Sequence, residues 1–190
     1  LVDSAGKYVA QFILKNIHNP FNSKFIVIAG PGNNGSDAII CHYYLLLYGV
    51  NSKLVLVNKK HKYSWIFDKY DIGIDSIEIY NDKYHFDPLA WYVDGIFGIG
   101  LKRDIIGIYE DVINKLKHCP NIISIDIPSG IYCDNGNIAR CCIVSEFTLA
   151  MGYPKIGHYI NDGLESTGNL YILDVGFVPI KEENDFIKYI

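Results

Sequence analysis

One stretch near the start of the chain restricts the possible folds more than any other feature. Residues 24–29 read Lys-Phe-Ile-Val-Ile-Ala, an apolar run of strand length that ends at a Gly-Pro-Gly turn. Near-continuous apolar strands are typical of parallel sheets that are buried on both faces. A helical pattern over 37–48, closed by Gly49, and a second apolar run over 53–57 follow this turn. Together they predict a strand–helix–strand unit with the right-handed crossover of a parallel sheet.

The rest of the chain continues this alternation of strands and helices. A stripe of apolar residues predicts an amphipathic helix that is capped by Ser4 and ends at Asn16, and a further helix is predicted over 105–116. The other predicted strands are 76–80, 91–94, 121–125, 146–150 and 169–173. This order predicts an α/β fold: a three-layer αβα sandwich, Rossmann-like, with a mostly parallel central sheet. Because no repeat or linker interrupts the pattern, we expect one domain over 1–190.

Composition and charge narrow the classes of partner. The formal net charge of -4 argues against a protein that binds nucleic-acid phosphates through a positive face. No apolar run approaches the roughly 18 residues of a membrane span, so we expect neither nucleic acid nor a membrane as a partner. The five cysteines have no zinc-type spacing, which favours reduced thiols in an intracellular protein. The one basic cluster, 59–62, is expected to be a solvated loop.

The turn after the first strand matches the glycine fingerprint of dinucleotide-binding folds. It reads Gly-Pro-Gly-Asn-Asn-Gly over 30–35, between a strand and a helix. Two residues differ from the usual nicotinamide version. Asn58 follows the second strand where an acid normally binds the ribose, and Asp37 places a carboxylate in the first turn of the predicted helix, where a phosphate would lie. These differences disfavour a hydride-transferring reductase, and the loop alone is equally compatible with a purely structural turn.

Two later strands also end in an aspartate, Asp94 and Asp126, and each is followed by a glycine-bearing turn. Since the carboxyl ends of parallel strands share one edge, we expect these carboxyl groups to meet Asp37 at a ligand crevice there. Their mutual repulsion requires either a bound cation or a raised pKa of one of them. Each turn taken singly is more simply explained as an ordinary turn that ends a strand and begins a loop.

An oxygen-rich set of side chains at this edge would suit a hard cation. The candidates are Asn34, Asp94 and Ser129. Two of the three are neutral, so the set fits a monovalent ion better than a divalent one. The histidines and cysteines are scattered along the chain, which argues against zinc.

Four motifs in this order resemble the YjeF N-terminal domain of NAD(P)H-hydrate epimerases. They are residues 30–37, 94–100, 125–130 and 154–157, and the resemblance extends from the first helix to a closing strand over 169–179. It implies that the chain is one such domain, truncated at its N-terminus. The implied activity interconverts the R and S forms of hydrated NADH and NADPH (NADHX and NADPHX) as part of nucleotide repair, upstream of a dehydratase.

The resemblance also implies roles for individual residues. Asp126 and Lys155 are the expected catalytic residues, and Asn34, Asp94 and Ser129 are the expected ligands of one potassium ion per subunit of a homodimer. Ser36 and Ile99 depart from the Gly and Thr that are usual in the family. The expected substrate-binding residues are Asn33, Asn34, Gly35, Ser36, Asp37, Gly98, Ile99, Gly100, Leu101, Lys102, Arg103, Asp104 and Asp126.

The implied reaction suits a carboxyl group. Protonation of the C6 hydroxyl lets water leave and produces an iminium ion that the ring nitrogen stabilises, and water that returns to the other face inverts the centre. A single carboxyl group, Asp126, can act as the acid and then as the base. Lys155 is expected either to hold a phosphate or to balance charge, and an ordinary surface lysine is the alternative. For Asp126 the alternative is a role in capping the turn over 128–130.

Two other functions compete with the epimerase. One is a non-catalytic interaction module of the same fold, as in RNA-decapping scaffolds or lipoprotein-binding proteins, and the less favoured one is the NAD(P)-dependent reductase. Loss of catalysis should erode the site, whereas its polar residues are all present. The chain begins without an initiator Met, so any targeting segment would lie upstream, and a cytoplasmic or mitochondrial location is expected.

Overall fold

The computed structural model describes residues 2–58 and 63–176, and its strands form one seven-stranded sheet. All pairings are parallel, in the order β3-β2-β1-β4-β5-β6-β7. The predicted α/β fold is confirmed, and the sheet is parallel throughout the described residues rather than mostly so. The strands are β1 (Lys24–Ala29), β2 (Asn51–Leu56), β3 (Ile77–Ile79), β4 (Trp91–Gly95), β5 (Ile122–Ile125), β6 (Phe147–Met151) and β7 (Asn169–Leu173).

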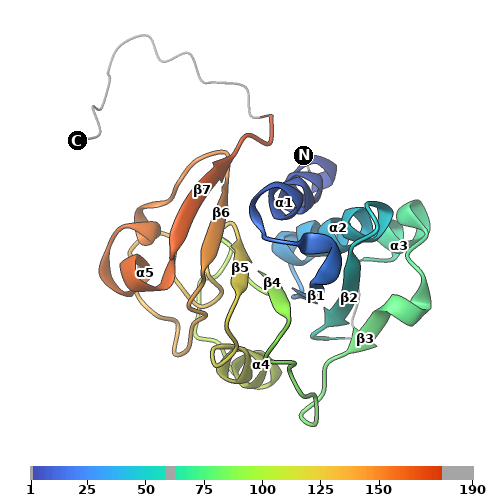
Figure 1. The fold of residues 1–190 in the computed structure, drawn as a ribbon. Coiled ribbons are helices and arrows are strands. Elements are labelled where there is room, and N and C mark those ends of the chain that lie inside the picture. Colours follow the sequence, from blue (N-terminus) through green and yellow to red (C-terminus); the bar gives the residue numbers. More distant parts are fainter. Residues whose placement is uncertain (1, 59–62, 177–190) are drawn as a thin grey trace.

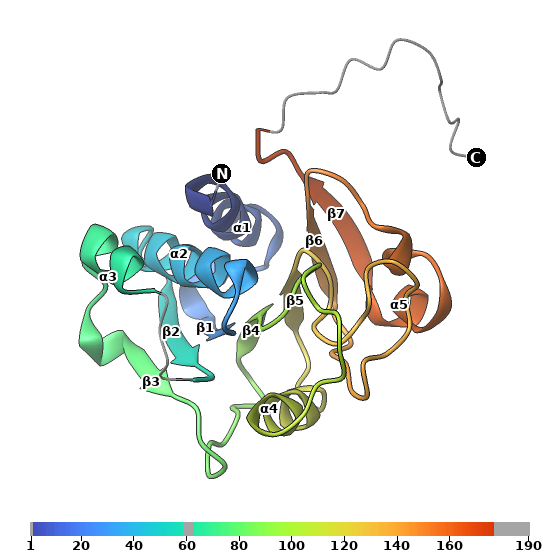
Figure 2. The same cartoon turned by 180° about the vertical axis from the view of Figure 1, so that it is seen from behind.

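Helices cover both faces of this sheet. Figures 1 and 2 show α1, α2 and α3 on one side, α4 on the other, and α5 beside the edge strand β7. The predicted three-layer sandwich is therefore confirmed. The helices are α1 (Val2–Asn16), α2 (Asn33–Leu47), α3 (Ser64–Tyr70), α4 (Ile108–Leu116) and α5 (Asn161–Ser166), with 3-10 turns η1 (Pro20–Asn22), η2 (Ile74–Ser76) and η3 (Ile156–His158).

The apolar run of β1 explains why the sheet is buried on both faces. Phe25 and Val27 pack into the cluster beneath α1 and α2, whereas Ile26 and Ile28 pack into the cluster beneath α4. Successive residues of a strand point to opposite faces, so a strand between two helical layers needs apolar residues at every position. All four of these side chains are buried.

The predicted helix boundaries need three corrections. α2 begins at Asn33 rather than at Asp37, because Gly32 is already its extended N-cap residue. α1 begins at Val2, so Ser4 lies inside the helix and is not its cap. α4 begins at Ile108 rather than at 105, because Gly107 has a φ of 67°, which a right-handed helix does not allow.

Other differences concern short elements and the ends of segments. α3 and α5 were not predicted, since helices of 7 and 6 residues carry too little periodicity to be recognised. The basic cluster over 59–62 and the end of the predicted closing strand, 177–179, lie outside the described residues. In the part of the chain that the structure describes, no helix has both the length and the apolar character needed to cross a membrane.

The order of the strands decides where a ligand can bind. From β1 the chain goes first to β2 and β3 on one side, and then to β4, β5, β6 and β7 on the other. Adjacent connections therefore leave β1 and β4 in opposite directions, which opens a crevice outside their carboxyl ends. The loops that follow β1, β4, β5 and β6 surround this crevice.

Candidate active site

A cavity of about 1140 Å³ lies at this crevice, and most of the predicted substrate-binding residues line it. Gly35 and Ser36 do not line the cavity, because they are buried in the first turn of α2. Asp104 is exposed outside it and accepts a hydrogen bond from the Tyr132 hydroxyl at 3.1 Å. The predicted residues that do line it are Asn33, Asn34, Asp37, Gly98, Ile99, Gly100, Leu101, Lys102, Arg103, Asp126 and Lys155.

The glycine loop after β1 has its shape because other parts of the chain approach it closely. A Cβ added at Gly30 would lie 1.9 Å from the carbonyl oxygen of Ile96, and one added at Gly35 would lie 2.0 Å from that of Gly30. The Tyr63 hydroxyl donates hydrogen bonds to the carbonyl oxygens of Gly30 and Gly32. The two glycines are therefore required by packing.

The first turn of α2, which carries Asn33 and Asn34, adjoins the cavity. It contains no acidic residue, because Asp37 lies one turn further along the helix than the sequence predicted. The first N–H groups of a helix lack partners within the helix, and together with the helix dipole they attract anions. Ser36 lies within this helical turn and is not among the described residues with positive φ, so its position does not require glycine.

Asp94, at the end of β4, lies beneath the cavity and is fully buried. Its Oδ1 accepts hydrogen bonds from the Ser129 hydroxyl at 2.6 Å and from the Ile96 N–H at 3.1 Å. Its Oδ2 accepts from the Ser124 hydroxyl at 2.8 Å and from the Ser129 N–H at 2.9 Å. Burial raises the pKa of Asp94, and these four donors oppose that effect. All four donate to it, which is the arrangement expected around a carboxylate.

The three predicted cation ligands form one connected group. Besides its bond to Asp94, Ser129 accepts a hydrogen bond through Oγ from the Phe97 N–H at 2.8 Å. The Asn34 side chain donates to the carbonyl oxygens of Phe97 at 2.9 Å and of Ile125 at 3.1 Å. In the described residues, no cluster of three or more His, Cys, Asp or Glu side chains could hold a metal ion. An amide, a hydroxyl and a single carboxylate are a donor set that fits a monovalent cation in its chemistry.

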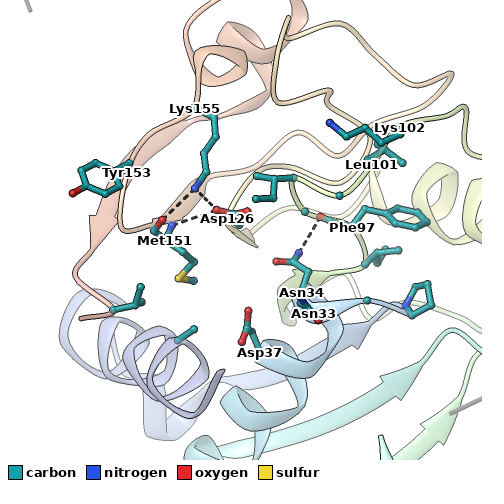
Figure 3. A pocket seen from close by; sticks show the side chains of 18 of the residues that line it. Asn33, Asn34, Asp37, Phe97, Leu101, Lys102, Asp126, Met151, Tyr153 and Lys155 are labelled. Carbon is teal, nitrogen blue, oxygen red and sulfur yellow. Dashed lines mark hydrogen bonds and ion pairs between the residues drawn. The ribbon is translucent and has the colours of Figure 1, made fainter. Parts of the chain in front are cut away.

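Asp126 follows β5 and carries the most unusual backbone of the site. Its φ of 68° lies in the left-handed region, which is uncommon for residues other than glycine. Its Oδ1 forms an ion pair with the Lys155 ammonium and accepts from the Met151 N–H at 3.4 Å. Lys155 also donates to the Met151 carbonyl oxygen at 3.2 Å (Figure 3). The Lys155 side chain is only 19% exposed, so the alternative of an ordinary surface lysine is wrong.

His158 connects the backbone groups of Asp126 and Lys155, a role that the sequence did not suggest. Its Nδ1 accepts a hydrogen bond from the Lys155 N–H at 3.0 Å, so its Nε2 carries the proton and donates to the Asp126 carbonyl oxygen at 2.9 Å. Burial lowers the pKa of His158, which favours this neutral form. His158 thus joins the loop that carries Lys155 to the backbone of Asp126.

Asp37 projects from α2 into the same cavity (Figure 3). Its Oδ1 is buried and has no hydrogen-bond partner. Burial, and then the nearby charge of Asp126, raise the pKa of Asp37 to about 7. The three aspartates therefore limit their mutual repulsion in different ways. Hydrogen-bond donors surround Asp94, and Lys155 pairs with Asp126. Asp37 has a raised pKa and so binds its proton more tightly.

Several residues that line the cavity were not predicted. Met151 and Tyr153 end and follow β6, so the rule that placed Asp94 and Asp126 could also have found them. Ala5 and Val175 carry no chemical signal in the sequence. The full set of unpredicted lining residues is Ala5, Pro31, Gly32, Ile96, Phe97, Met151, Tyr153 and Val175.

Two relatives with the same name illustrate the similarity to known proteins. The NAD(P)H-hydrate epimerase of Oenococcus oeni is 31% identical over 183 residues, covering 93% of this chain and 85% of that protein. The enzyme of the same name from Entamoeba histolytica is 31% identical over 207 residues, covering 99% of this chain and 87% of that protein.

A longer relative and a solved structure extend this comparison. The bifunctional NAD(P)H-hydrate repair enzyme Nnr of Thermofilum pendens is 29% identical over 99% of this chain, but the chain spans only 38% of that relative's length. The crystal structure of yeast YNL200c superposes with a TM-score of 0.70 at 23% identity, covering 97% of this chain and 86% of that one, which supports the fold. The family model of the YjeF-related protein N-terminus matches residues 1–157. The chain therefore belongs to the YjeF-related protein N-terminus family.

Proposed function

We propose that this domain is an NAD(P)H-hydrate epimerase, which interconverts the R and S forms of NADHX and NADPHX. The observation that carries the proposal is the ion pair of Asp126 and Lys155 in the wall of a large cavity that adjoins a helix N-terminus. The names of the relatives that match most of the chain support the same reaction.

The cavity offers separate surfaces for the two chemically different parts of such a substrate. The first turn of α2 presents backbone N–H groups to an anion, and Lys102 and Arg103 line the cavity as cations, so the phosphates of the substrate bind there. The hydrated nicotinamide ring then reaches the carboxyl groups of Asp126 and Asp37. Ile99 contributes an apolar side chain, 49% exposed, to the cavity wall in place of the family's usual threonine.

A potassium ion is part of the proposal. Asn34, Asp94 and Ser129 would hold it, since they supply the oxygen ligands of a weakly charged site. When bound, the ion would supply positive charge next to the phosphate-binding end of the cavity.

The carboxyl group of Asp126 acts on C6 of the substrate. It is held by Lys155 and by the Met151 N–H, so its orientation is set before substrate binds. An ionised carboxylate there stabilises the cationic iminium intermediate by electrostatic attraction and exchanges a proton with the water that leaves or adds.

The proposal also includes two partners, a second copy of the domain and a dehydratase. The domain forms a homodimer and supplies the epimer that a dehydratase consumes, which is consistent with relatives that are named bifunctional repair enzymes. Light scattering coupled to gel filtration measures the dimer: a monomer at micromolar concentration would remove that part of the proposal.

Conversion of separated epimers tests the activity. The purified protein is mixed with the R form of NADHX or NADPHX, and chromatography follows the S form, in potassium and in sodium buffers. We expect conversion above the spontaneous rate, faster with potassium. Asp126→Asn should lower kcat by about 10²–10⁴-fold, whereas Glu165→Gln, on the exposed face of α5, should not.

The alternatives predict different results. An interaction module of the same fold would leave the spontaneous rate unchanged, and full activity of Asp126→Asn would remove the proposed chemistry. A reductase would instead bind intact NADPH tightly and oxidise it in the presence of an acceptor.

A further inference from the structure

Two carboxyl groups, rather than one, reach into the cavity at its reactive end. Asp37 comes from α2 and Asp126 from the turn after β5, and Figure 3 draws them from different elements with open space between. No hydrogen bond joins them among the described residues, although the charge of Asp126 acts on Asp37. A substrate ring that enters the cavity can therefore contact both.

The two carboxyl groups differ in the partners that they have for a negative charge. Asp126 has the Lys155 ammonium and the Met151 N–H as partners, and both stabilise a negative charge. Asp37 has a buried oxygen without any donor, which makes its negative charge costly. Two carboxyl groups in unequal surroundings are the usual basis for dividing the roles of acid and base.

Burial has the largest effect on the pKa of Asp37 and raises it; the charge of Asp126 acts in the same direction, and the charge of the N-terminal amine has a lesser, opposing effect. Asp126, across the cavity, repels a negative charge on Asp37, and the Lys155 ammonium is already paired with Asp126. The Cys41 thiol, one turn further along α2, is fully buried and has its pKa raised by burial and by Asp37, so it stays neutral. The pKa of Asp37 is raised to about 7, so much of the protein holds this proton at neutral pH.

We propose that Asp37 is a second catalytic residue of the epimerisation, which carries a proton on the face of the substrate opposite to Asp126. This inference rests on the proposed function and replaces the single carboxyl group expected from the sequence with a pair that shares one proton. Inversion at C6 requires departure from one face and addition to the other, which one carboxyl group on one face cannot serve equally well.

The Asp37 carboxylic acid gives its proton to the C6 hydroxyl, the C6–O bond breaks, and water leaves with the bonding pair. The lone pair of the ring nitrogen forms the C=N bond of the iminium ion. Water then adds to the opposite face of C6 and gives a proton to the Asp126 carboxylate. In the reverse direction the two residues exchange roles, and the proton returns from one to the other between turnovers.

Three variants test this inference in the complete chain. Asp37→Asn keeps the shape but carries no proton, so kcat should fall by about 10²–10⁴-fold in both directions, with KM changed less than kcat. Asp37→Glu should recover part of kcat, and Glu165→Gln is the control. In the wild type kcat/KM should fall as the pH rises above about 7, because the acid loses its proton, and this decline should be absent from Asp37→Asn.

A titration that does not depend on activity completes the test. Carbon-13 NMR of labelled aspartate should give a midpoint near 7 for Asp37, and this midpoint should fall in Asp126→Asn, where the opposing charge is gone. A midpoint in the ordinary range for aspartate would overturn the inference. So would a raised KM with unchanged kcat in Asp37→Asn, which is the pattern of a residue that only binds substrate.

The outcomes separate the two proposals. If the wild type does not convert either epimer, the proposed function fails and the inference fails with it. If the wild type converts both epimers and Asp37→Asn does so at the same rate, only the role of Asp37 is overturned.

Discussion

Two groups of residues at the cavity contain carboxyl groups in different surroundings. We call Asp94 and its donors, which lie beneath the cavity, the floor, and we call Asp37, Asp126 and Lys155, which line it, the wall. In the floor, Asp94 accepts four hydrogen bonds from Ser124, Ser129 and the Ile96 N–H. In the wall, Asp126 has one cation beside it, and Asp37 has a buried oxygen with no partner. The first arrangement is closed in the sense that each oxygen of Asp94 already has two donors from the protein, whereas the second leaves carboxyl oxygens that a ligand can contact.

This difference separates structural from chemical roles among residues that look alike in the sequence. A buried charge that is fully hydrogen-bonded holds its neighbours in place, and its loss costs stability. A buried charge that is incompletely paired costs stability in the free protein and is retained where it does chemistry.

Asp94→Ala should lower the free energy of unfolding by about 4 kcal/mol, because each buried donor left without an acceptor costs about 1–3 kcal/mol. The affected donors are the hydroxyls of Ser124 and Ser129 and two backbone N–H groups. Urea unfolding measures the change. A loss below 1 kcal/mol would mean that these donors do not depend on Asp94. Asp37→Asn, which replaces an ionisable group without a donor on its buried oxygen by a neutral amide, should not lower stability.

His42 extends the comparison to a closed site far from the cavity. Its ring nitrogens contact the hydroxyls of Ser52 at 2.8 Å and Ser76 at 3.1 Å, and burial lowers its pKa from 6.5 to about 4. Below pH 6.5 the unfolded chain therefore binds a proton that the folded protein does not, so stability falls as the pH falls toward 4. The contribution is at most about 3 kcal/mol.

The pH dependence of unfolding tests this expectation. Carboxyl groups contribute to the same decline, so the measurement is the difference between the wild type and His42→Asn across this pH range. Equal slopes for the two proteins would show that His42 does not behave as a closed group.

Lys155→Met removes the cation that pairs with Asp126 and keeps an unbranched side chain of similar length. Without it the carboxyl group of Asp126 loses its ion-pair partner and one of the contacts that orient it. At neutral pH kcat should fall about 10–100-fold, which corresponds to about 1.4–2.8 kcal/mol. Lys155→Arg should retain more activity than Lys155→Met. A kcat of Lys155→Met equal to that of the wild type would contradict the proposed role of the pair.

Ser124→Ala should give the smallest effect, about 1 kcal/mol of stability. It removes one of the four donors to Asp94 and the hydroxyl partner of Ser145 at 2.6 Å. Epimerisation should be unchanged, because Ser124 does not line the cavity. Loss of activity with no loss of stability would reverse the division between floor and wall.

The fold was predictable because two features of the sequence, an apolar run and the residue that interrupts it, indicate the central strands. Their apolar runs have strand length, and a glycine or an aspartate interrupts the run at the end of β4 and directly after β1 and β5. The rule for carboxyl ends then placed Asp94 and Asp126 at one edge. The start of α2 was misplaced because Asn33 and Asn34 favour turns in isolation, and only the contacts of the glycine loop draw them into a helix.

What the sequence could not provide is the state of each carboxyl group. Whether an aspartate is satisfied depends on partners that are distant in the chain, such as Ser129 for Asp94 and Lys155 for Asp126. The role of His158 depends in the same way on two backbone groups brought together by folding. Such contacts follow from packing and leave no local pattern.

The parallel order of the strands also affects when the site forms during folding. Its residues are dispersed from Asn33 on α2 to Lys155 after β6, and consecutive parallel strands need long crossover connections before they can pair. Contacts between distant residues form slowly, because the entropy lost in closing each loop precedes the gain. A chain growing from its N-terminus can complete α1, β1, α2 and β2 well before β6 emerges. Asp126 therefore meets its lysine only late in synthesis, and catalytic competence is a property of the nearly finished domain.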